Sequence, residues 1–102
     1  MEIISALFHL FSAKKFNSYL WKTQPAGRGN YIRELLETDL IRGKEAEEVE
    51  LMLGRNESCS RMANRWTYVL NLNSTSHKKY YLAVYFENGI AVKVRKEYKT
   101  IQ

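Results

Sequence analysis

Residues that could act in catalysis are few and scattered along the chain. The sequence holds one cysteine, Cys59, and two histidines, His9 and His77. Nucleophilic catalysis needs a Ser or Cys beside a positioned base, with a third group that orients the base. His9 lies in an apolar stretch and His77 in a polar one, and no spacing brings either to Cys59. We therefore predict that the protein is not an enzyme.

Motifs for phosphate, dinucleotide or metal binding are also missing. The sequence has no P-loop, no dinucleotide-binding glycine motif and no pair of metal ligands at a recognised spacing. The acidic run Glu45, Glu47 and Glu48 is typical of a solvated helix face that matches the helix dipole. Residues 56–58 match the glycosylation sequon, and we interpret them as part of a polar loop. We predict no cofactor, no metal and no small-molecule substrate.

The composition is that of one small basic domain. The chain has 102 residues, of which 45% are hydrophobic and 26% are charged, and its formal net charge is +5. This length fits a single domain, which we assign to residues 1–102. One cysteine cannot form an internal disulfide, so a reducing compartment, the cytoplasm, is expected. No apolar run approaches the roughly 18–20 residues of a transmembrane helix.

The charge is unevenly divided along the chain. Residues 31–60 carry four basic and eight acidic side chains, a local charge of −4, whereas residues 61–102 carry a local charge of +6. Different faces of the molecule would therefore attract different partners.

The first residues predict an amphipathic helix that forms part of a lead-in over residues 1–21. Apolar side chains between Ile3 and Phe11 recur at helical spacing, and two lysines follow at 14 and 15. A secretory signal has its positive charge before the apolar stretch, whereas here the lysines follow it. We therefore do not interpret these residues as a secretory signal. We expect the helix to dock on the domain or on a dimer mate. Binding of residues 3–15 to a membrane surface is the alternative.

Two helices are predicted over residues 30–54. Residues 22–30 hold the only proline and are expected to form a loop, with Asn30 as the N-cap of a short helix that ends near Thr38. A second helix is predicted over about 44–53, with Gly54 as its C-terminal cap.

Three strands are predicted over residues 65–98. Arg65–Leu72 is rich in aromatic and β-branched residues, and two further strands flank Asn88–Gly89. The order helix–helix–strand–strand–strand, with an extra N-terminal helix, predicts an α+β two-layer domain. Its sheet is a three-stranded antiparallel meander.

The hairpin at Asn88–Gly89 allows two registers. A two-residue turn pairs Glu87 with Ile90 and mixes apolar and charged residues on both faces. A three-residue loop with Gly89 in a bulge pairs Phe86 with Ile90 and creates a wholly apolar face, so we predict this register. The apolar face would hold Leu82, Val84, Phe86, Ile90, Val92 and Val94, and the opposite face Tyr81, Ala83, Tyr85, Ala91, Lys93 and Arg95.

Four motifs follow one another within residues 16–96: FNSYLWK, RELLETDLIRGKEAEEVELMLG, RWTYVL and LAVYFENGIAVKV. As a set they resemble the BamE-like family of small bacterial proteins, also called SmpA/OmlA. The resemblance implies the same order of helices and strands, a binding role rather than catalysis and, for the exported lipoproteins of the family, outer-membrane assembly. The lipoprotein signal and lipid-attachment cysteine are not seen here, and Glu45 replaces the capping serine or threonine.

The predicted outer face of the sheet is the best candidate for binding. Tyr81, Tyr85, Lys93 and Arg95 combine rigid rings with cations, as protein interfaces do. Such a face can also stack bases and neutralise phosphates, but the strand order is not that of a typical RNA-binding sheet. An ordinary half-solvated sheet face is the third interpretation.

Taken together, the sequence predicts a non-enzymatic protein-binding module in the cytoplasm. A small bacterial inhibitor or immunity-type protein, which occludes a partner such as a toxin, fits best. The basic sheet would favour an acidic partner, whereas Glu47 and Glu48 would favour a basic one such as a nuclease toxin. The alternatives are an envelope-assembly accessory of BamE-like type and a nucleic-acid-binding protein; nucleic acid is the less favoured partner.

Overall fold

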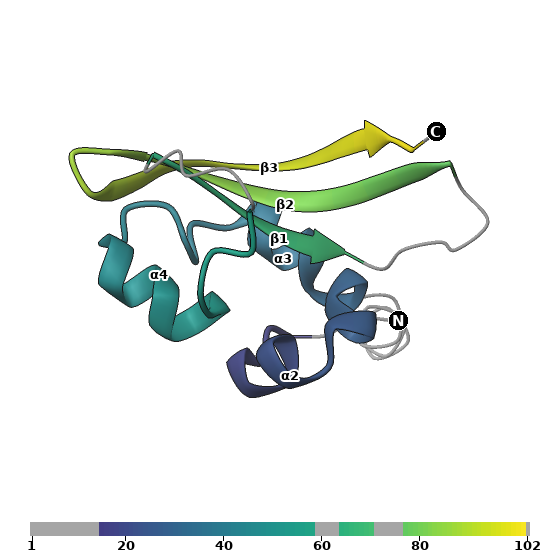
Figure 1. Cartoon of the computed structure of the whole chain (residues 1–102). Helices are drawn as coiled ribbons and strands as arrows, with labels where there is room; N and C mark the ends of the chain where they lie inside the picture. The colour runs from purple at the N-terminus through teal and green to yellow at the C-terminus, as the bar shows by residue number, and fades with distance from the viewer. Residues whose placement is uncertain (1–14, 59–63, 71–76, 102) are drawn as a thin grey trace, which may run out of the picture.

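The computed structural model describes residues 15–58, 64–70 and 77–101, and it confirms the predicted α+β class (Figure 1). The three strands form one antiparallel sheet in the order β1-β2-β3. Residues 3–11 and Cys59 lie outside the described residues. The elements are α2 (Ser18–Thr23), the 3-10 helix η1 (Pro25–Tyr31), α3 (Ile32–Glu37), α4 (Ala46–Leu53), β1 (Arg65–Leu70), β2 (Lys78–Glu87) and β3 (Ile90–Thr100).

The helical layer covers one face of the sheet, and no helix covers the other face among the described residues (Figure 1). The core lies between the two layers. It is built from the apolar stripes of the helices and the inward-facing side chains of the strands. These apolar faces are removed from water by packing against each other. Its fully buried members include Trp21, Leu35, Ile41, Val49, Leu53, Tyr68, Leu82 and Val84.

The segment before α3 differs from the prediction. Pro25–Tyr31 is a 3-10 helix rather than a loop, with Pro25 at its start, where the fixed φ of proline suits a helical turn. The predicted N-cap Asn30 is wrong, since α3 follows directly and Tyr31 occupies the cap position without a side-chain hydrogen bond. An earlier helix, α2, begins at Ser18 and is capped by Asn17, whose Oδ1 accepts a hydrogen bond from the Leu20 amide at 2.9 Å.

The second predicted helix is confirmed as α4. The backbone amide of Glu45 donates to the Glu48 side chain at 3.3 Å, so a residue expected to bind a partner helps to cap its own helix. Gly54 ends the helix at φ 88°, a conformation that favours glycine. Within the described residues, no helix has both the length and the apolar character needed to cross a membrane.

The predicted hairpin register is wrong. The turn has two residues, with Asn88 and Gly89 both at positive φ, and it pairs Glu87 with Ile90. This geometry matches the strand twist and needs residues such as Asn-Gly that tolerate positive φ. A bulge then shifts the register between the Phe86–Ala91 and Tyr85–Lys93 pairs. Ala91 therefore joins the core, and Val92 is 39% exposed.

Candidate functional site

The outer face of the sheet brings four predicted residues together. Side chains alternate between the two faces of a strand, and the register aligns Tyr81 with Glu97 and Tyr85 with Lys93. The intervening Ala83 lies opposite Arg95. The bulge precedes these pairs, so it leaves Tyr81, Tyr85, Lys93 and Arg95 on the same side despite the corrected register.

Tyr85 is held at the centre of this face by charged neighbours on both adjacent strands. Lys93 Nζ lies 4.5 Å from the centroid of its ring, and the guanidinium carbon of Arg65 lies 5.8 Å from it. The Tyr85 hydroxyl donates a short hydrogen bond to Glu97 and accepts one from Arg65 Nε at 3.3 Å. The ring and its hydroxyl are therefore fixed before any partner binds.

The same residues form an ion pair that links β1 to β3 across β2. Arg65 donates to Glu97, and the two side chains are 29% and 23% exposed. Burial opposes ionisation of Glu97, but the hydrogen bonds from Tyr85 and Arg65 outweigh it, so the pKa of Glu97 is lowered. The hydrogen bond to Glu97 likewise raises the pKa of Arg65. Sequence reasoning missed Arg65 and Glu97, because only the pairing of three strands brings them together.

Tyr81 and Arg95 remain open to a partner. Neither side chain forms a hydrogen bond or a ring contact with another described residue, although the charge of Arg95 acts on nearby Glu97. Tyr81 lines a shallow hollow of about 660 Å³ on the outer face, together with Thr67 and Val69 of β1 and Lys79 and Lys99 at the far ends of the strands. Glu57, Arg65 and Glu97 also line it, and each of these is held in an ion pair. Lys79 and Lys99 form no ion pair with another described residue, so they leave the hollow attractive to an acidic ligand surface.

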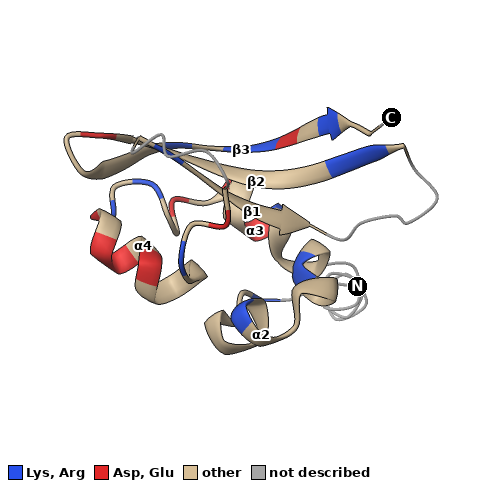
Figure 2. Ribbon diagram, viewed as in Figure 1, with Lys and Arg blue, Asp and Glu red and all other residues tan. Residues whose placement is uncertain are grey.

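A second group of rings and cations lies on the opposite face, near the ends of β2 and β3. The rings of Tyr80 and Tyr98 are 6.0 Å apart. Lys96 Nζ lies 4.9 Å from the Tyr80 ring centroid, and Lys78 Nζ lies 4.4 Å from that of Tyr98. The alternation of tyrosine and lysine in these strands is a signal in the sequence that could have identified this group. Basic residues are concentrated toward the ends of β2 and β3 (Figure 2). The register places Lys79 and Lys99 on the outer face there, and Lys78 and Lys96 on the opposite face.

The acidic candidates Glu47 and Glu48 are not part of this surface. They are exposed on α4, which packs on the other face of the sheet (Figure 2). Leu51 of the same helix is 74% exposed. The exposed carboxylates of α4 therefore lie apart from the cations Lys93 and Arg95 of the outer face.

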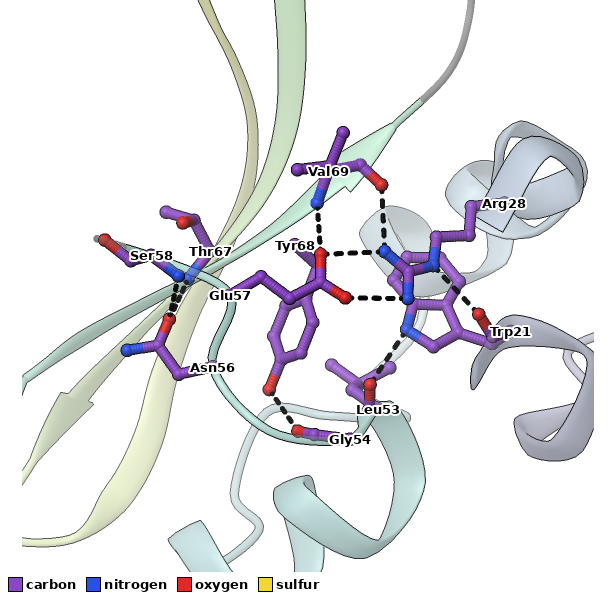
Figure 3. A network of polar contacts seen from close by, with 10 residues as sticks. All are labelled: Trp21, Arg28, Leu53, Gly54, Asn56, Glu57, Ser58, Thr67, Tyr68 and Val69. Carbon is purple, nitrogen blue, oxygen red and sulfur yellow. Dashed lines mark hydrogen bonds and ion pairs between the residues drawn. The ribbon is translucent and has the colours of Figure 1, made fainter. Parts of the chain in front are cut away.

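A polar network at the outer edge of β1 contains a buried arginine (Figure 3). Arg28 is 3% exposed and forms a bidentate pair with Glu57, with Nη1–Oε1 and Nη2–Oε2 distances of 3.0 and 2.9 Å. Its Nε donates to the carbonyl oxygen of Trp21 at 2.8 Å, and its guanidinium carbon lies 4.8 Å from the Trp21 ring centroid. These hydrogen bonds and the ion pair compensate the cost of removing the Arg28 charge from water.

This network satisfies the outward backbone groups of β1 (Figure 3). The Val69 amide donates to Glu57 Oε1 at 2.8 Å, and its carbonyl accepts from Arg28 Nη1 at 3.0 Å. The Thr67 amide donates to Asn56 Oδ1 at 2.9 Å, and its carbonyl accepts from the Glu57 amide at 2.9 Å. Residues 56–58, interpreted from the sequence as a polar loop, therefore have a structural role.

The network is tied to the helices by two further hydrogen bonds. Trp21 Nε1 donates to the Leu53 carbonyl at 3.1 Å, and the Tyr68 hydroxyl donates to the Gly54 carbonyl at 2.9 Å. Burial, with smaller contributions from nearby carboxylates, raises the pKa of Tyr68, so this hydroxyl keeps its proton. The arrangement holds Gly54 and residues 56–58 against β1 and the helices.

Among the described residues, no three His, Cys, Asp or Glu side chains gather in a way that could hold a metal ion. The pairing of Cys59 with His77 falls partly outside these residues.

No family model matches the chain, and no curated protein or solved structure does either. The resemblance to the BamE-like family therefore stays a prediction from motifs, and so does the role in envelope assembly that it implies.

Proposed function

We propose that this protein is a non-enzymatic binding module that holds an acidic surface of a partner protein on the outer face of its sheet. The observation that carries the proposal is the open face itself: helices cover one side of the sheet, while the other side presents Tyr81, Tyr85, Lys93 and Arg95. Tyrosine and arginine are typical anchors of protein interfaces, and an excess of cations attracts an acidic partner.

The fixed position of Tyr85 supports a protein partner over a nucleic acid. Base stacking needs an accessible ring face, and Lys93 and Arg65 both lie against this ring. A preorganised ring and a fixed cation lower the entropy lost when a protein surface docks. The acidic helix α4 is less suited to be the main interface, because Glu48 already serves its cap.

The more specific role that the sequence analysis favours is that of a cytoplasmic inhibitor of the bacterial immunity type. Such a protein acts by covering the working surface of its target, for example a toxin, and needs no catalytic group. A rigid face on a small domain suits this task, because rigid surfaces lose little entropy on binding.

The test is capture of the partner from an extract of the native host by the tagged full-length protein. The double variant Lys93→Glu with Arg95→Glu should weaken binding of the identified partner by about tenfold or more, because two anchoring cations become repulsive. The matched control is Arg33→Glu with Arg55→Glu, which makes the same change in net charge at exposed positions outside the sheet. Equal loss in both variants would show a non-specific charge effect and refute the proposal.

Two further experiments distinguish a protein partner from a nucleic acid and test the immunity-type role. Retention on heparin or RNA at about 50 mM salt, with a steep loss at higher salt, would favour nucleic acid and count against a protein partner. If the partner is a toxin, deletion of this gene should harm the host only when the toxin is present. Absence of harm in that background would exclude the immunity-type role.

A further inference from the structure

The outer edge of β3 has hydrogen-bonding groups that point away from the sheet. The Ile101 amide donates to the His77 carbonyl at 2.6 Å, so this pair faces inward. Antiparallel strands alternate inward and outward residues. The register therefore turns Lys93, Arg95, Glu97 and Lys99 toward β2, and turns the backbone amides and carbonyls of Val94, Lys96, Tyr98 and Thr100 outward.

No described residue bonds to these outward groups. Residues 15–58, 64–70 and 77–101 contain no hydrogen bond to the backbone edge between Val94 and Thr100 other than the ladder to β2. We call this stretch the open edge. It contrasts with β1, where Asn56, Glu57 and Arg28 satisfy every outward group of Thr67 and Val69.

The start of the same edge already accepts an added backbone segment. The Gly43 amide donates to the Ala91 carbonyl and the Ala91 amide donates to the Lys44 carbonyl, both at 2.8 Å. Glu45 and Ile90 form an isolated antiparallel bridge, and the Ala46 amide donates to the Gly89 carbonyl at 2.9 Å. This short pairing stops before the open edge begins, so an added strand would continue an existing line of pairing.

The side chains along the open edge are predominantly cationic. Arg95 and Lys99 project on the outer face, as does Lys93 directly before the open edge, and Lys96 projects on the other face. Glu97 is the one acidic residue between Ile90 and Thr100, and it is already bound by Arg65 and Tyr85. A second copy of this chain would bring the same cations against themselves, which opposes pairing. An acidic strand would be attracted.

We propose that the open edge of β3 binds an extended acidic segment of the partner protein as a fourth strand. This inference rests on the proposed function and specifies how the partner is held. Backbone hydrogen bonds to Val94, Lys96, Tyr98 and Thr100 would supply affinity, as in other proteins that bind peptides by strand addition. Carboxylates at alternate positions of the segment would lie beside Lys93, Arg95 and Lys99.

A hollow beside the first residue of the open edge fits this arrangement. It has a volume of about 290 Å³ and is lined mainly by polar side chains, namely Glu37, Thr38, Asp39, Arg42 and Lys93, together with Leu35, Leu36 and Val94. A polar side chain at the end of the added strand would find both hydrogen-bond donors and acceptors there. Pockets for alternate side chains are what give specificity in strand addition.

The probe is a synthetic peptide of alternating Glu and Val, matched in length to the open edge and capped at both ends. Binding to the full-length protein is followed by NMR, where the amides of Lys96 and Tyr98 should shift and exchange more slowly with solvent. The comparison peptide has the same sequence with its valine amides N-methylated, so its charge is unchanged and its donors are removed. We expect it to bind about tenfold more weakly.

The matched protein variants are Tyr98→Pro and Tyr98→Thr. Both remove the ring, but only proline removes the outward donor, and an edge position of this kind tolerates proline. Tyr98→Pro should bind the peptide about tenfold more weakly than Tyr98→Thr. If Tyr98→Pro does not fold, the N-methylated peptide still decides the question.

Three outcomes would overturn the inference. The peptide could fail to bind at about 1 mM, the weak limit of specific recognition. It could bind with no sensitivity to N-methylation or to proline while Lys93→Glu with Arg95→Glu abolishes binding; the outer face would then act alone, and the proposed function would stand. Light scattering could show a dimer that Tyr98→Pro dissociates, which would assign the edge to a second copy.

Discussion

The two edges of the sheet differ in how their outward backbone amides and carbonyls are satisfied. At β1, each outward amide and carbonyl of Thr67 and Val69 is paired, and a buried arginine completes the arrangement. At β3, the segment Gly43–Ala46 covers only the first residues, and the edge stays open from Val94 onward. Unpaired edges invite other strands, so proteins usually cover them or place charges along them.

The difference indicates a division of tasks between the edges. The β1 edge binds the segment 56–58 and the helices to the sheet, so its groups serve stability. The β3 edge carries cations instead of a cover, which keeps identical copies apart and leaves the backbone free for an acidic strand. The Arg65–Tyr85–Glu97 group connects β1 to β3 across the outer face.

The largest expected effect comes from breaking the closed edge at Glu57. The variant Glu57→Gln leaves Arg28 buried without its countercharge, and we expect the free energy of unfolding to fall by about 3 kcal/mol. Urea denaturation followed by circular dichroism measures this. Glu87→Gln is the control, since Glu87 is exposed and forms no ion pair with another described residue. It should change stability by less than about 0.5 kcal/mol. Equal effects of the two changes would show that the network does not stabilise β1.

Proline at matched positions compares the edges directly. Val69→Pro removes the amide that donates to Glu57, and should cost about 1–3 kcal/mol more than Val69→Thr. Tyr98→Pro removes an amide with no partner among the described residues, and should cost less than about 1 kcal/mol relative to Tyr98→Thr. Thermal and urea unfolding of the four variants give the two differences. A penalty at Tyr98 as large as that at Val69 would show that the β3 edge is not open.

The smallest effect concerns the ion pair that links the edges. Glu97→Gln should cost less than about 1 kcal/mol at neutral pH, because the pair is partly exposed. The pKa of Glu97 is lower in the folded state than its ordinary value of 4.5. Its contribution to stability is therefore complete above about pH 4.5 and is lost as the pH falls through the lower, folded-state pKa. The stability difference between wild type and Glu97→Gln should shrink over this range in urea titrations, and a difference independent of pH would contradict the assignment.

Local patterns allowed much of the fold to be predicted. The apolar periodicity predicted α3 and α4, Gly54 predicted the end of α4, and Asn88–Gly89 predicted the hairpin. Alternation within β2 predicted that Tyr81 and Tyr85 share a face. The exact register could not be predicted from alternation. Strict alternation implies that a two-residue turn would mix apolar and charged side chains on each face. The bulge at Ala91–Val92 allows the two-residue turn and still places Val84 opposite Val94.

By itself, the sequence determined α3, α4 and the three strands, their order and the basic character of the strands, because these depend on neighbours within a few residues. It did not reveal α2 or the 3-10 helix η1. Only the tertiary structure decided which edge is closed and which is open. Arg28 bonds to Glu57 and to Val69, and Arg65 to Glu97, across separations of 29, 41 and 32 residues. Contacts over such distances along the chain leave no local pattern, since the geometry that joins them is created by the packing of the whole domain.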